Sequence, residues 1–175
     1  GNSSLLLFAS AAQMIVITSG GIDLSTGALM STTACLAVEI MYGDNHLLIP
    51  AILVGMAFGF LVGLINGAAV AYVRIPALIM TLSMSLVLTK FQPIFTGAYP
   101  RGTISEQFAG ALSHRFLGFV PGFFVYALVF YGIVVVFLNR TRYGQRLNLV
   151  GTNPMASLLT GVRFERTTTP AYSTA

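Results

Sequence analysis

Charged residues are scarce in this chain, and tryptophan is absent from it. Only 8% of the 175 residues are Asp, Glu, Lys or Arg, whereas a soluble domain carries about 25%. With 55% hydrophobic residues and a mean hydropathy of +0.83, the composition excludes an ordinary soluble domain and indicates a membrane protein. Without Trp, the interfacial aromatic residues of such a protein must be Tyr and Phe.

Cysteine and positive charge are also missing from large parts of the chain. Cys35 is the single cysteine, which excludes an intramolecular disulfide and a cysteine-based zinc site, so we interpret it as a packing residue. No Lys or Arg precedes Arg74. The late part of the chain instead contains Arg140, Arg142, Arg146, Arg163 and Arg166. This asymmetry predicts a cytoplasmic late segment rather than nucleic-acid binding.

Residues 18–25, Thr-Ser-Gly-Gly-Ile-Asp-Leu-Ser, interrupt apolar sequence with two glycines and a carboxylate. A Gly pair breaks a helix because each Gly costs about 1 kcal/mol relative to Ala. Asp23 or Ser25 then caps a helix that restarts at Thr26. In lipid such a break is tolerated only where it is buried in protein or lines a wet cavity, and we interpret it as the wall of a pathway. The alternative is an ordinary turn at the membrane surface with Asp23 as its N-cap.

Hydropathy predicts an all-α membrane protein, a polytopic bundle of transmembrane helices with a broken or re-entrant helix around Gly20 and Gly21. The apolar segments lie at about residues 5–20, 26–42, 47–73, 76–92 and 119–138. Gln13 in the first segment is interpreted as a tolerated polar residue rather than one that faces a neighbouring helix. The fourth segment is predicted to fray at residues 90–93, and residues 97–116 to form a solvated loop.

Glycine recurs at every fourth residue within the segment 47–73. At 3.6 residues per turn, these glycines form a slowly spiralling stripe along which another helix backbone can approach closely. The stripe consists of Gly55, Gly59, Gly63 and Gly67. Asn66 lies beside it and either hydrogen-bonds across a helix interface, which is the favoured interpretation, or touches a polar substrate.

Residues 139–166 are polar and basic, and they are predicted to contain a short cytoplasmic helix before a further helix begins at residues 167–175. Asn153 or Thr152 fits the N-cap of that helix, Pro154 its first turn and Gly161 its C-terminal end. A capped helix in an Arg-rich loop suits docking against a soluble partner. The alternative is a surface helix held by anionic lipid.

A cytoplasmic late segment determines the orientation of the other segments by alternation across the membrane. Residues 97–116 and 43–46 are then expected outside, and Arg74 inside. The break at residues 20–23 is expected toward the inside or at depth in the membrane. The chain starts with Gly1 and ends without a cap or charge cluster, so we expect it to be a fragment of a longer protein.

Several motifs, in the same order, resemble permease subunits of ribose-type ABC sugar importers. Residues 19–27, SGGIDLSTG, are similar to the family signature GGIDLSvG, and residues 151–162 are similar to its cytoplasmic loop GgNpeAArlsGi. Matching motifs also occur at residues 66–67, 75–82 and 141–144. The resemblance covers nearly the whole chain and departs from the family pattern at residues 145–146 and 157–159.

The resemblance implies a transmembrane permease subunit of an ATP-driven importer. Such a subunit moves a ribose-like monosaccharide across the bacterial inner membrane by alternating access. It implies no enzymatic site, no cofactor and no metal in this chain, because partner subunits hydrolyse ATP; nothing here resembles a P-loop. The implied partners are ABC ATPase subunits, a periplasmic or extracellular sugar-binding protein, a second permease copy (identical or a paralogue) and membrane lipid.

The resemblance also implies roles for individual residues, to which the residue patterns add Thr152 and Asn66. The expected coupling residues are Thr152, Asn153, Pro154, Met155, Ala156 and Gly161. The expected pathway residues are Gly21, Ile22, Asp23, Ser25 and Asn66.

Other functions remain open at this point. The substrate could be another polar metabolite, such as a nucleoside or a sugar-like signalling molecule, and the chain could be a channel or structural membrane subunit without ATP coupling. An intramembrane enzyme that uses Asp23 as acid or base is disfavoured. Such chemistry needs a second catalytic group within reach, and Glu39 lies along the next helix toward the opposite membrane face.

Overall fold

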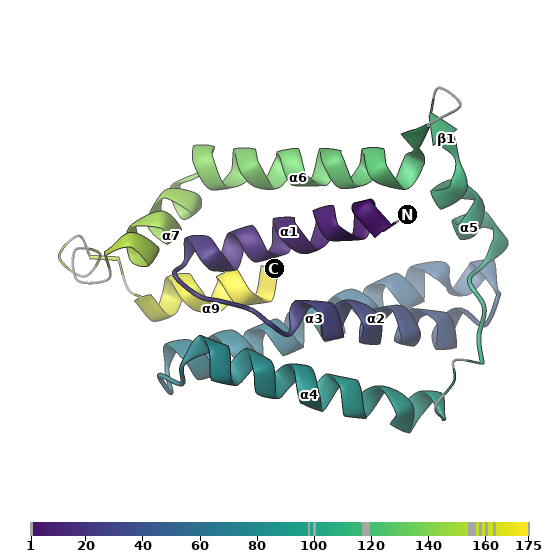
Figure 1. The fold of residues 1–175 in the computed structure, drawn as a ribbon, viewed down its shortest axis with the longest axis horizontal. Helices are drawn as coiled ribbons and strands as arrows, with labels where there is room; N and C mark the ends of the chain where they lie inside the picture. The colour runs from purple at the N-terminus through teal and green to yellow at the C-terminus, as the bar shows by residue number, and fades with distance from the viewer. Residues whose placement is uncertain are drawn as a thin grey trace.

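The computed structural model describes residues 2–97, 99, 101–116, 120–153, 157, 159, 161–162 and 164–174. These residues are mainly helical (Figure 1). The helices are α1 (Asn2–Thr18), α2 (Thr26–Met41), the 3-10 turn η1 (Asn45–Leu47), α3 (Leu48–Ala71), α4 (Ala77–Thr96), α5 (Glu106–Ser113), α6 (Gly122–Arg140), α7 (Arg142–Thr152) and α9 (Phe164–Thr174). A two-residue antiparallel pairing joins β1 (Arg115–Phe116) to β2 (Val120–Pro121). The all-α class predicted from the sequence is confirmed.

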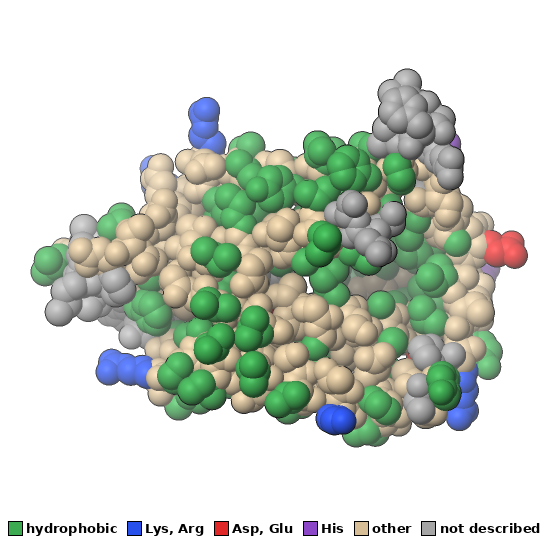
Figure 2. Space-filling view, viewed as in Figure 1, with side chains coloured by type: hydrophobic (Ala, Val, Ile, Leu, Met, Phe, Trp, Pro, Cys, Tyr) green, Lys and Arg blue, Asp and Glu red, His purple; other side chains and the backbone are tan. Residues whose placement is uncertain are grey.

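Three helical stretches are long and apolar enough to cross a membrane: Asn45–Ala71, Ala77–Thr96 and Gly122–Arg140. The apolar helices α1 and α2 contain 17 and 16 residues. At 1.5 Å per residue each is about 25 Å long, which falls short of the ~30 Å hydrocarbon core. Figure 2 shows hydrophobic side chains across the middle of the visible face and charged side chains at its periphery, as expected for a surface against lipid.

The connections between helices gather at two ends of the bundle (Figure 1). The end of α1, the α3–α4 connection at Arg74 and helix α7 lie at one end, which we call the inner end. The α2–α3 connection, α5 and the β1–β2 pair lie at the opposite end. This arrangement agrees with the alternation predicted from the positions of the arginines.

The hydrophobic core lies where α1, α6, α7 and α9 meet. Its buried members are Ala11, Ile15, Val134, Leu138, Leu147 and Ala171. Helix α7 contributes Leu147 to this core, and Leu147 and Val150 are both 0% exposed, while Arg142 and Arg146 on the same helix are exposed. Buried residues at this helical spacing form one apolar face, which explains why α7 packs against the inner end of the bundle with its charged face outward.

Two parts of the sequence prediction are wrong because local capping signals were not recognised. Residues 97–116 contain helix α5, whose N-cap Ser105 accepts a hydrogen bond from the Phe108 N–H at 3.4 Å. Helix α7 was predicted only as polar loop. Its N-cap Thr141 accepts from the Gly144 N–H at 3.1 Å. A Ser or Thr cap followed by apolar residues three apart is the signal that finds both helices.

Helix α4 does not fray at residues 90–93 but continues through Pro93 to Thr96. Tertiary contacts hold this last turn. The Gln92 Nε2 donates to the Cys35 sulfur of α2 at 2.8 Å, and the Phe91 ring stacks on Phe58 of α3 with centroids 6.2 Å apart. Packing against neighbours therefore outweighs the local cost of a proline in the helix.

Candidate functional site

The break between α1 and α2 begins with a glycine-terminated helix end. Gly20 has φ +81°, its N–H donates to the Ile17 carbonyl at 2.9 Å, and the Gly21 N–H donates to the Val16 carbonyl at 3.1 Å. This pair of bonds is the Schellman motif, in which glycine adopts the left-handed conformation without strain. The first glycine of the pair therefore ends α1, where the sequence predicts a break.

Both glycines of the pair lie close to atoms of other helices, and Gly21 has no space for a side chain. A Cβ on Gly21 would collide with the hydroxyl of Tyr172 on α9. A Cβ on Gly20 would lie 3.3 Å from the Gly151 Cα, and one on Gly151 would overlap the Thr18 carbonyl oxygen. The inner end of α1 and the end of α7 therefore touch backbone against backbone. Gly151 and Tyr172 are contacts that local sequence patterns do not reveal.

The Asp23 carboxylate is directed at the start of α2. Its Oδ1 accepts hydrogen bonds from the Ser25 N–H at 2.7 Å and from the Ser25 hydroxyl at 2.6 Å. Ser25 is the N-cap residue, and its own side chain makes no cap bond to the helix. A negative charge at this position is favourable because the N-terminus of a helix carries partial positive charge. Of the two capping candidates, Asp23 is the residue whose side chain accepts from the backbone.

Gln13 holds the backbone of Asp23 from α1. With the amide assigned so that both of its groups are satisfied, Nε2 lies 2.9 Å from the Asp23 carbonyl oxygen and Oε1 lies 3.2 Å from the Asp23 nitrogen. The interpretation of Gln13 as a merely tolerated polar residue is wrong. It supplies two hydrogen bonds that the broken helix cannot supply to its own backbone.

Thr81 on α4 holds the residues on either side of Asp23. Its Oγ1 accepts from the Leu24 N–H at 3.1 Å and lies 3.2 Å from the Ile22 carbonyl and 2.9 Å from the Ala77 carbonyl, either of which can accept its hydroxyl hydrogen. Thr81 is fully buried. Side chains from two different helices therefore satisfy the backbone of the extended segment, which allows it to stay ordered inside an apolar bundle.

Asn66 joins α3 to this segment. Its Nδ2 donates to the Ser25 hydroxyl oxygen at 3.0 Å, so that a continuous chain of hydrogen bonds runs from Asn66 through Ser25 to Asp23. The Asn66 Oδ1 has no hydrogen-bond partner among the described residues. Asn66 thus bonds across the α2–α3 interface, and its place in a pathway stays a prediction.

The expected pathway residues differ in exposure. Asp23 and Ser25 belong to the hydrogen-bonded network with Asn66, and Gly21 lies against Tyr172, but the Ile22 side chain is 48% exposed. Glu39, the second group that an intramembrane enzyme would need, accepts from the Arg101 N–H at 2.6 Å near the other end of α2. Among the described residues, no three His, Cys, Asp or Glu side chains are grouped to hold a metal ion.

The four glycines of the α3 stripe have different surroundings. A Cβ on Gly67 would lie 2.7 Å from the Thr169 carbonyl oxygen of α9, and one on Gly63 would overlap the Tyr172 backbone. Gly55 and Gly59 have no atom within 4 Å of an added Cβ in the described structure. Helix α9 therefore approaches the inner half of the stripe, and the contribution of the stripe to packing energy stays a prediction.

The structure describes part of the expected coupling segment. Thr152 ends α7, and the Asn153 carbonyl accepts from the Ser157 N–H at 3.0 Å. Gly161 has φ +76°, and the Val162 N–H donates to the Ser157 carbonyl at 2.9 Å, as at a glycine-terminated helix end. Pro154, Met155 and Ala156 lie outside the described residues. The role of this segment in coupling stays a prediction.

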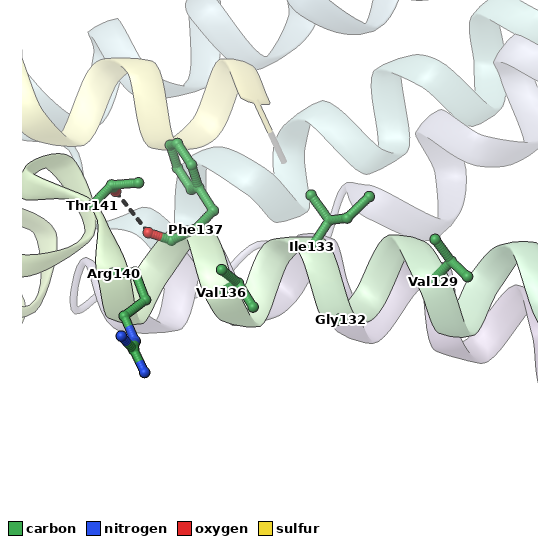
Figure 3. A pocket seen from close by; sticks show the side chains of 7 residues that line it. All are labelled: Val129, Gly132, Ile133, Val136, Phe137, Arg140 and Thr141. Atoms are coloured by element: carbon green, nitrogen blue, oxygen red, sulfur yellow. Dashed lines mark hydrogen bonds between the residues drawn. The ribbon is translucent and has the colours of Figure 1, made fainter.

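Two hollows differ sharply in character. A groove of about 590 Å³ follows α6, where Val129, Ile133, Val136 and Phe137 line it and Arg140 marks its inner end (Figure 3). Its side chains are those of a lipid-facing surface. The second, a cavity of about 260 Å³, lies between the break, the α3–α4 connection, the end of α7 and α9, and it includes Gly20 and Gly21 in its wall.

Comparisons with known proteins show what this bundle is similar to. A family model described as the permease component of branched-chain amino acid transport systems matches residues 2–173. The fructose import permease protein FrcC of Rhizobium meliloti is 31% identical over 173 residues, covering 93% of this chain and 47% of that protein. The ribose import permease protein RbsC of Escherichia coli K12 is 29% identical over 163 residues, covering 91% of this chain and 50% of that protein.

The galactose/methyl galactoside import permease protein MglC of Haemophilus influenzae is 24% identical over 196 residues, covering 99% of this chain and 56% of that protein. The chain thus spans about half the length of the curated relatives it matches. No solved structure matches the chain. Because the family model covers nearly all of it, the chain belongs to the family of branched-chain amino acid transport system permease components, as a multi-pass protein of the bacterial inner membrane.

Proposed function

We propose that this chain forms part of the permease subunit of an ATP-driven ABC importer that moves a monosaccharide across the inner membrane by alternating access. The observation that carries the proposal is the broken α1–α2 unit, whose irregular backbone is held by Gln13 and Thr81. Discontinuous helices of this kind form substrate sites in transporters because unwound backbone is tolerated in a membrane where it lines a cavity. Gly21, Ile22, Asp23, Ser25 and Asn66 are the pathway residues of this proposal.

A sugar is the proposed substrate for two reasons. The relatives FrcC, RbsC and MglC are named for fructose, ribose and galactose, whereas the family description names branched-chain amino acids. An amino acid carries both charges, and a desolvated charge needs a charged or strongly hydrogen-bonding partner. The proposed pathway residues include one carboxylate, Asp23, and no cation, so they offer no charged partner to the carboxylate of an amino acid, which favours an uncharged substrate.

The partners belong to the same proposal. Permease subunits are not themselves enzymes, so ABC ATPase subunits would hydrolyse ATP and dock on the inner end at Thr152, Asn153, Pro154, Met155, Ala156 and Gly161. A periplasmic or extracellular sugar-binding protein would deliver substrate at the opposite end, and a second permease copy would complete the path. The exposed Arg142 and Arg146 of α7 provide positive charge beside the docking segment.

The first test is a pull-down of the natural protein with the ATPase encoded beside it. Residues 153–160 are replaced by a Gly/Ser sequence, which keeps Gly151 in its contact with Gly20. A matched control replaces residues 106–113 of α5 at the opposite end. We expect loss of ATPase binding only in the first variant, with both variants eluting as folded protein. Equal binding by the two variants would overturn the coupling assignment.

Uptake into vesicles tests the substrate. The assembled importer is given labelled fructose, ribose, galactose and leucine in separate experiments with ATP. We expect uptake of at least one sugar and none of leucine. Uptake of leucine alone would replace the sugar proposal with the amino acid named in the family description.

A further inference from the structure

Helix α6 has a buried face and an exposed face that carries the groove of about 590 Å³. Val134 and Leu138 are buried in the core that α6 shares with α1, α7 and α9. A Cβ on Gly132 would have nothing within 4 Å, so this glycine leaves a gap in the exposed face. The exposed residues that line the groove recur every three or four positions along α6, and they are Val129, Gly132, Ile133, Val136, Phe137 and Arg140 (Figure 3).

The groove is as long as one leaflet of a membrane. Val129 and Arg140 are 11 positions apart in one continuous helix. At 1.5 Å per residue they are about 16 Å apart along the helix axis, and half of the ~30 Å hydrocarbon core is about 15 Å. Because Arg140 is the last residue of α6 at the inner end of the bundle, the groove extends from near the middle of the membrane to its inner surface. An acyl chain of an inner-leaflet phospholipid has the same position and length.

The side chains of the groove favour a lipid chain over another helix. Helices pack closely in membranes through small residues, and this bundle follows that rule where α9 approaches Gly63 and Gly67 of α3. On α6, by contrast, the large apolar side chains of Val129, Ile133 and Val136 project from the exposed face. A flexible chain can follow such a surface and fill the gap at Gly132, whereas the backbone of a second helix is kept at a distance.

Arg140 places a positive charge at the inner end of the groove. Its side chain is exposed, and Figure 3 shows the guanidinium group extending away from the helix axis. Arginine side chains near the ends of spanning helices reach the membrane surface, where a guanidinium can bind phosphate through two parallel hydrogen bonds. Arg142, also exposed, adds positive charge two positions later. Positive groups at the cytoplasmic surface attract lipids with anionic headgroups.

We infer that the groove on α6 is a binding site for an inner-leaflet phospholipid with an anionic headgroup. One acyl chain lies along Val129, Ile133 and Val136, and the headgroup phosphate binds the Arg140 guanidinium. The site does not depend on which substrate the protein transports. Since Thr141 directly follows Arg140 and is the N-cap of α7, the bound headgroup lies where α6 is connected to the basic helix at the inner end.

Photocrosslinking of the natural protein, assembled with its ATPase in nanodiscs, tests this site. The probes are phosphatidylglycerol and phosphatidylcholine that carry the same diazirine-labelled acyl chain, and mass spectrometry quantifies the labelled peptides of residues 122–140. We expect the phosphatidylglycerol probe to label the groove about fivefold more than the phosphatidylcholine probe. Excess unlabelled phosphatidylglycerol should remove this difference, while the same amount of phosphatidylcholine should not.

Arg140→Gln should reduce the preference for the anionic probe to about one while the groove remains labelled by both probes. Arg74→Gln is the matched control, because Arg74 is also exposed at the inner end but lies in the α3–α4 connection outside the groove lining. It removes the same charge from the protein and should leave the preference unchanged. Equal losses in the two variants would show that net charge attracts the lipid, which overturns the site at Arg140.

Gly132→Leu tests the groove itself, because it fills the gap and leaves Arg140 in place. The added side chain has open space, so the variant should elute and unfold as the wild type does. We expect its preference for the anionic probe to fall, since the acyl chain loses its place beneath the headgroup. An unchanged preference in this variant overturns the groove as the site of the acyl chain. Equal labelling of the wild type by both probes, or no labelling of residues 122–140 by either, overturns the inference.

Discussion

The Asn66 side chain on α3 donates a hydrogen bond of 3.0 Å to the Ser25 hydroxyl at the start of α2, and both residues are buried. This bond connects two residues that are 41 positions apart in sequence. Because the Ser25 hydroxyl donates in turn to the Asp23 carboxylate, the bond also orients the only charged side chain of the break. The stability of the α2–α3 interface and the geometry of the break are therefore linked through one serine.

Replacement of Ser25 by alanine should destabilise the protein by about 1–3 kcal/mol, because the Asn66 amide then stays buried without its acceptor. The measurement is thermal or detergent-induced unfolding. Ser83→Ala is the control, since Ser83 is exposed and bonds only to its own helix; it should change stability by less than about 0.5 kcal/mol. Equal effects of the two substitutions would contradict the linkage.

Replacement of Thr81 by valine should loosen the extended segment while α4 stays helical. Valine has nearly the same shape but cannot accept from the Leu24 N–H or donate to the Ile22 carbonyl. We expect hydrogen exchange at the Leu24 amide to accelerate by about tenfold. Thr89→Val on the same helix is the control, because the Thr89 hydroxyl bonds only within α4. An unchanged exchange rate at Leu24 would show that another group holds the segment.

Alanine at position 21 should be far less tolerated than alanine at position 27. A Cβ on Gly21 collides with the Tyr172 hydroxyl, and overpacking of this kind costs about 1–3 kcal/mol. Gly27 lies in α2 with nothing within 4 Å of an added Cβ, so Gly27→Ala should stabilise the helix by up to about 1 kcal/mol. Adding Tyr172→Phe to Gly21→Ala should recover part of the loss. Thermal unfolding of the three variants decides the matter.

The two halves of the α3 glycine stripe should differ in how well they tolerate alanine. Gly67→Ala is expected to destabilise the bundle by about 1–3 kcal/mol, because the methyl group meets the Thr169 backbone of α9. Gly59→Ala meets nothing within 4 Å and should be neutral or stabilising. If both substitutions destabilise equally in the natural protein, Gly59 also faces a close neighbour there.

Tyr143 on α7 should lose its hydroxyl proton at a higher pH than a free tyrosine does. The free energy of unfolding should therefore fall at high pH. Burial raises its pKa from 10.0 to about 12, and its hydroxyl donates to the Thr167 carbonyl at 3.0 Å. The folded protein keeps this proton where the unfolded chain loses it. Its contribution to stability is therefore complete below pH 10 and disappears as the pH rises from about 10 to about 12.

Tyr143→Phe gives the corresponding measurement. Below pH 11 the tyrosinate absorbance of wild type and variant should rise equally, because Tyr143 is still protonated there. The stability difference between the two proteins should shrink as the pH rises from about 10 to about 12. A variant that loses one tyrosine's worth of absorbance near pH 10 would show that Tyr143 titrates normally.

The sequence predicts those features of the fold whose signals are local. The apolar segments and the Gly20–Gly21 break depend on composition and on the helix preference of glycine, which a short window contains. Helices α5 and α7 were also locally marked, by Ser105 and Thr141 as caps, and could have been found. The residues that hold the backbone of the break could not be found from local sequence.

Gln13, Thr81 and Tyr172 belong to three helices and meet the break only in the folded protein. Thr81 bonds to Leu24 across 57 sequence positions. Helical periodicity does not distinguish it from Thr89, which bonds within α4, although the motif at residues 75–82 contains Thr81 and not Thr89. Periodicity predicts which face of a helix is polar, but it does not predict which polar group will satisfy a particular backbone atom of a distant segment.

The contact of Gly20 with Gly151 has a mechanical consequence. Side chains at an interface absorb small displacements by changing rotamer, but two glycine backbones in van der Waals contact have no such freedom. A larger residue at either position would therefore have to be accommodated by movement of the backbone of α1 or α7. The spacing between the basic end of α7 and the broken helix is thus determined by main-chain atoms alone at this contact.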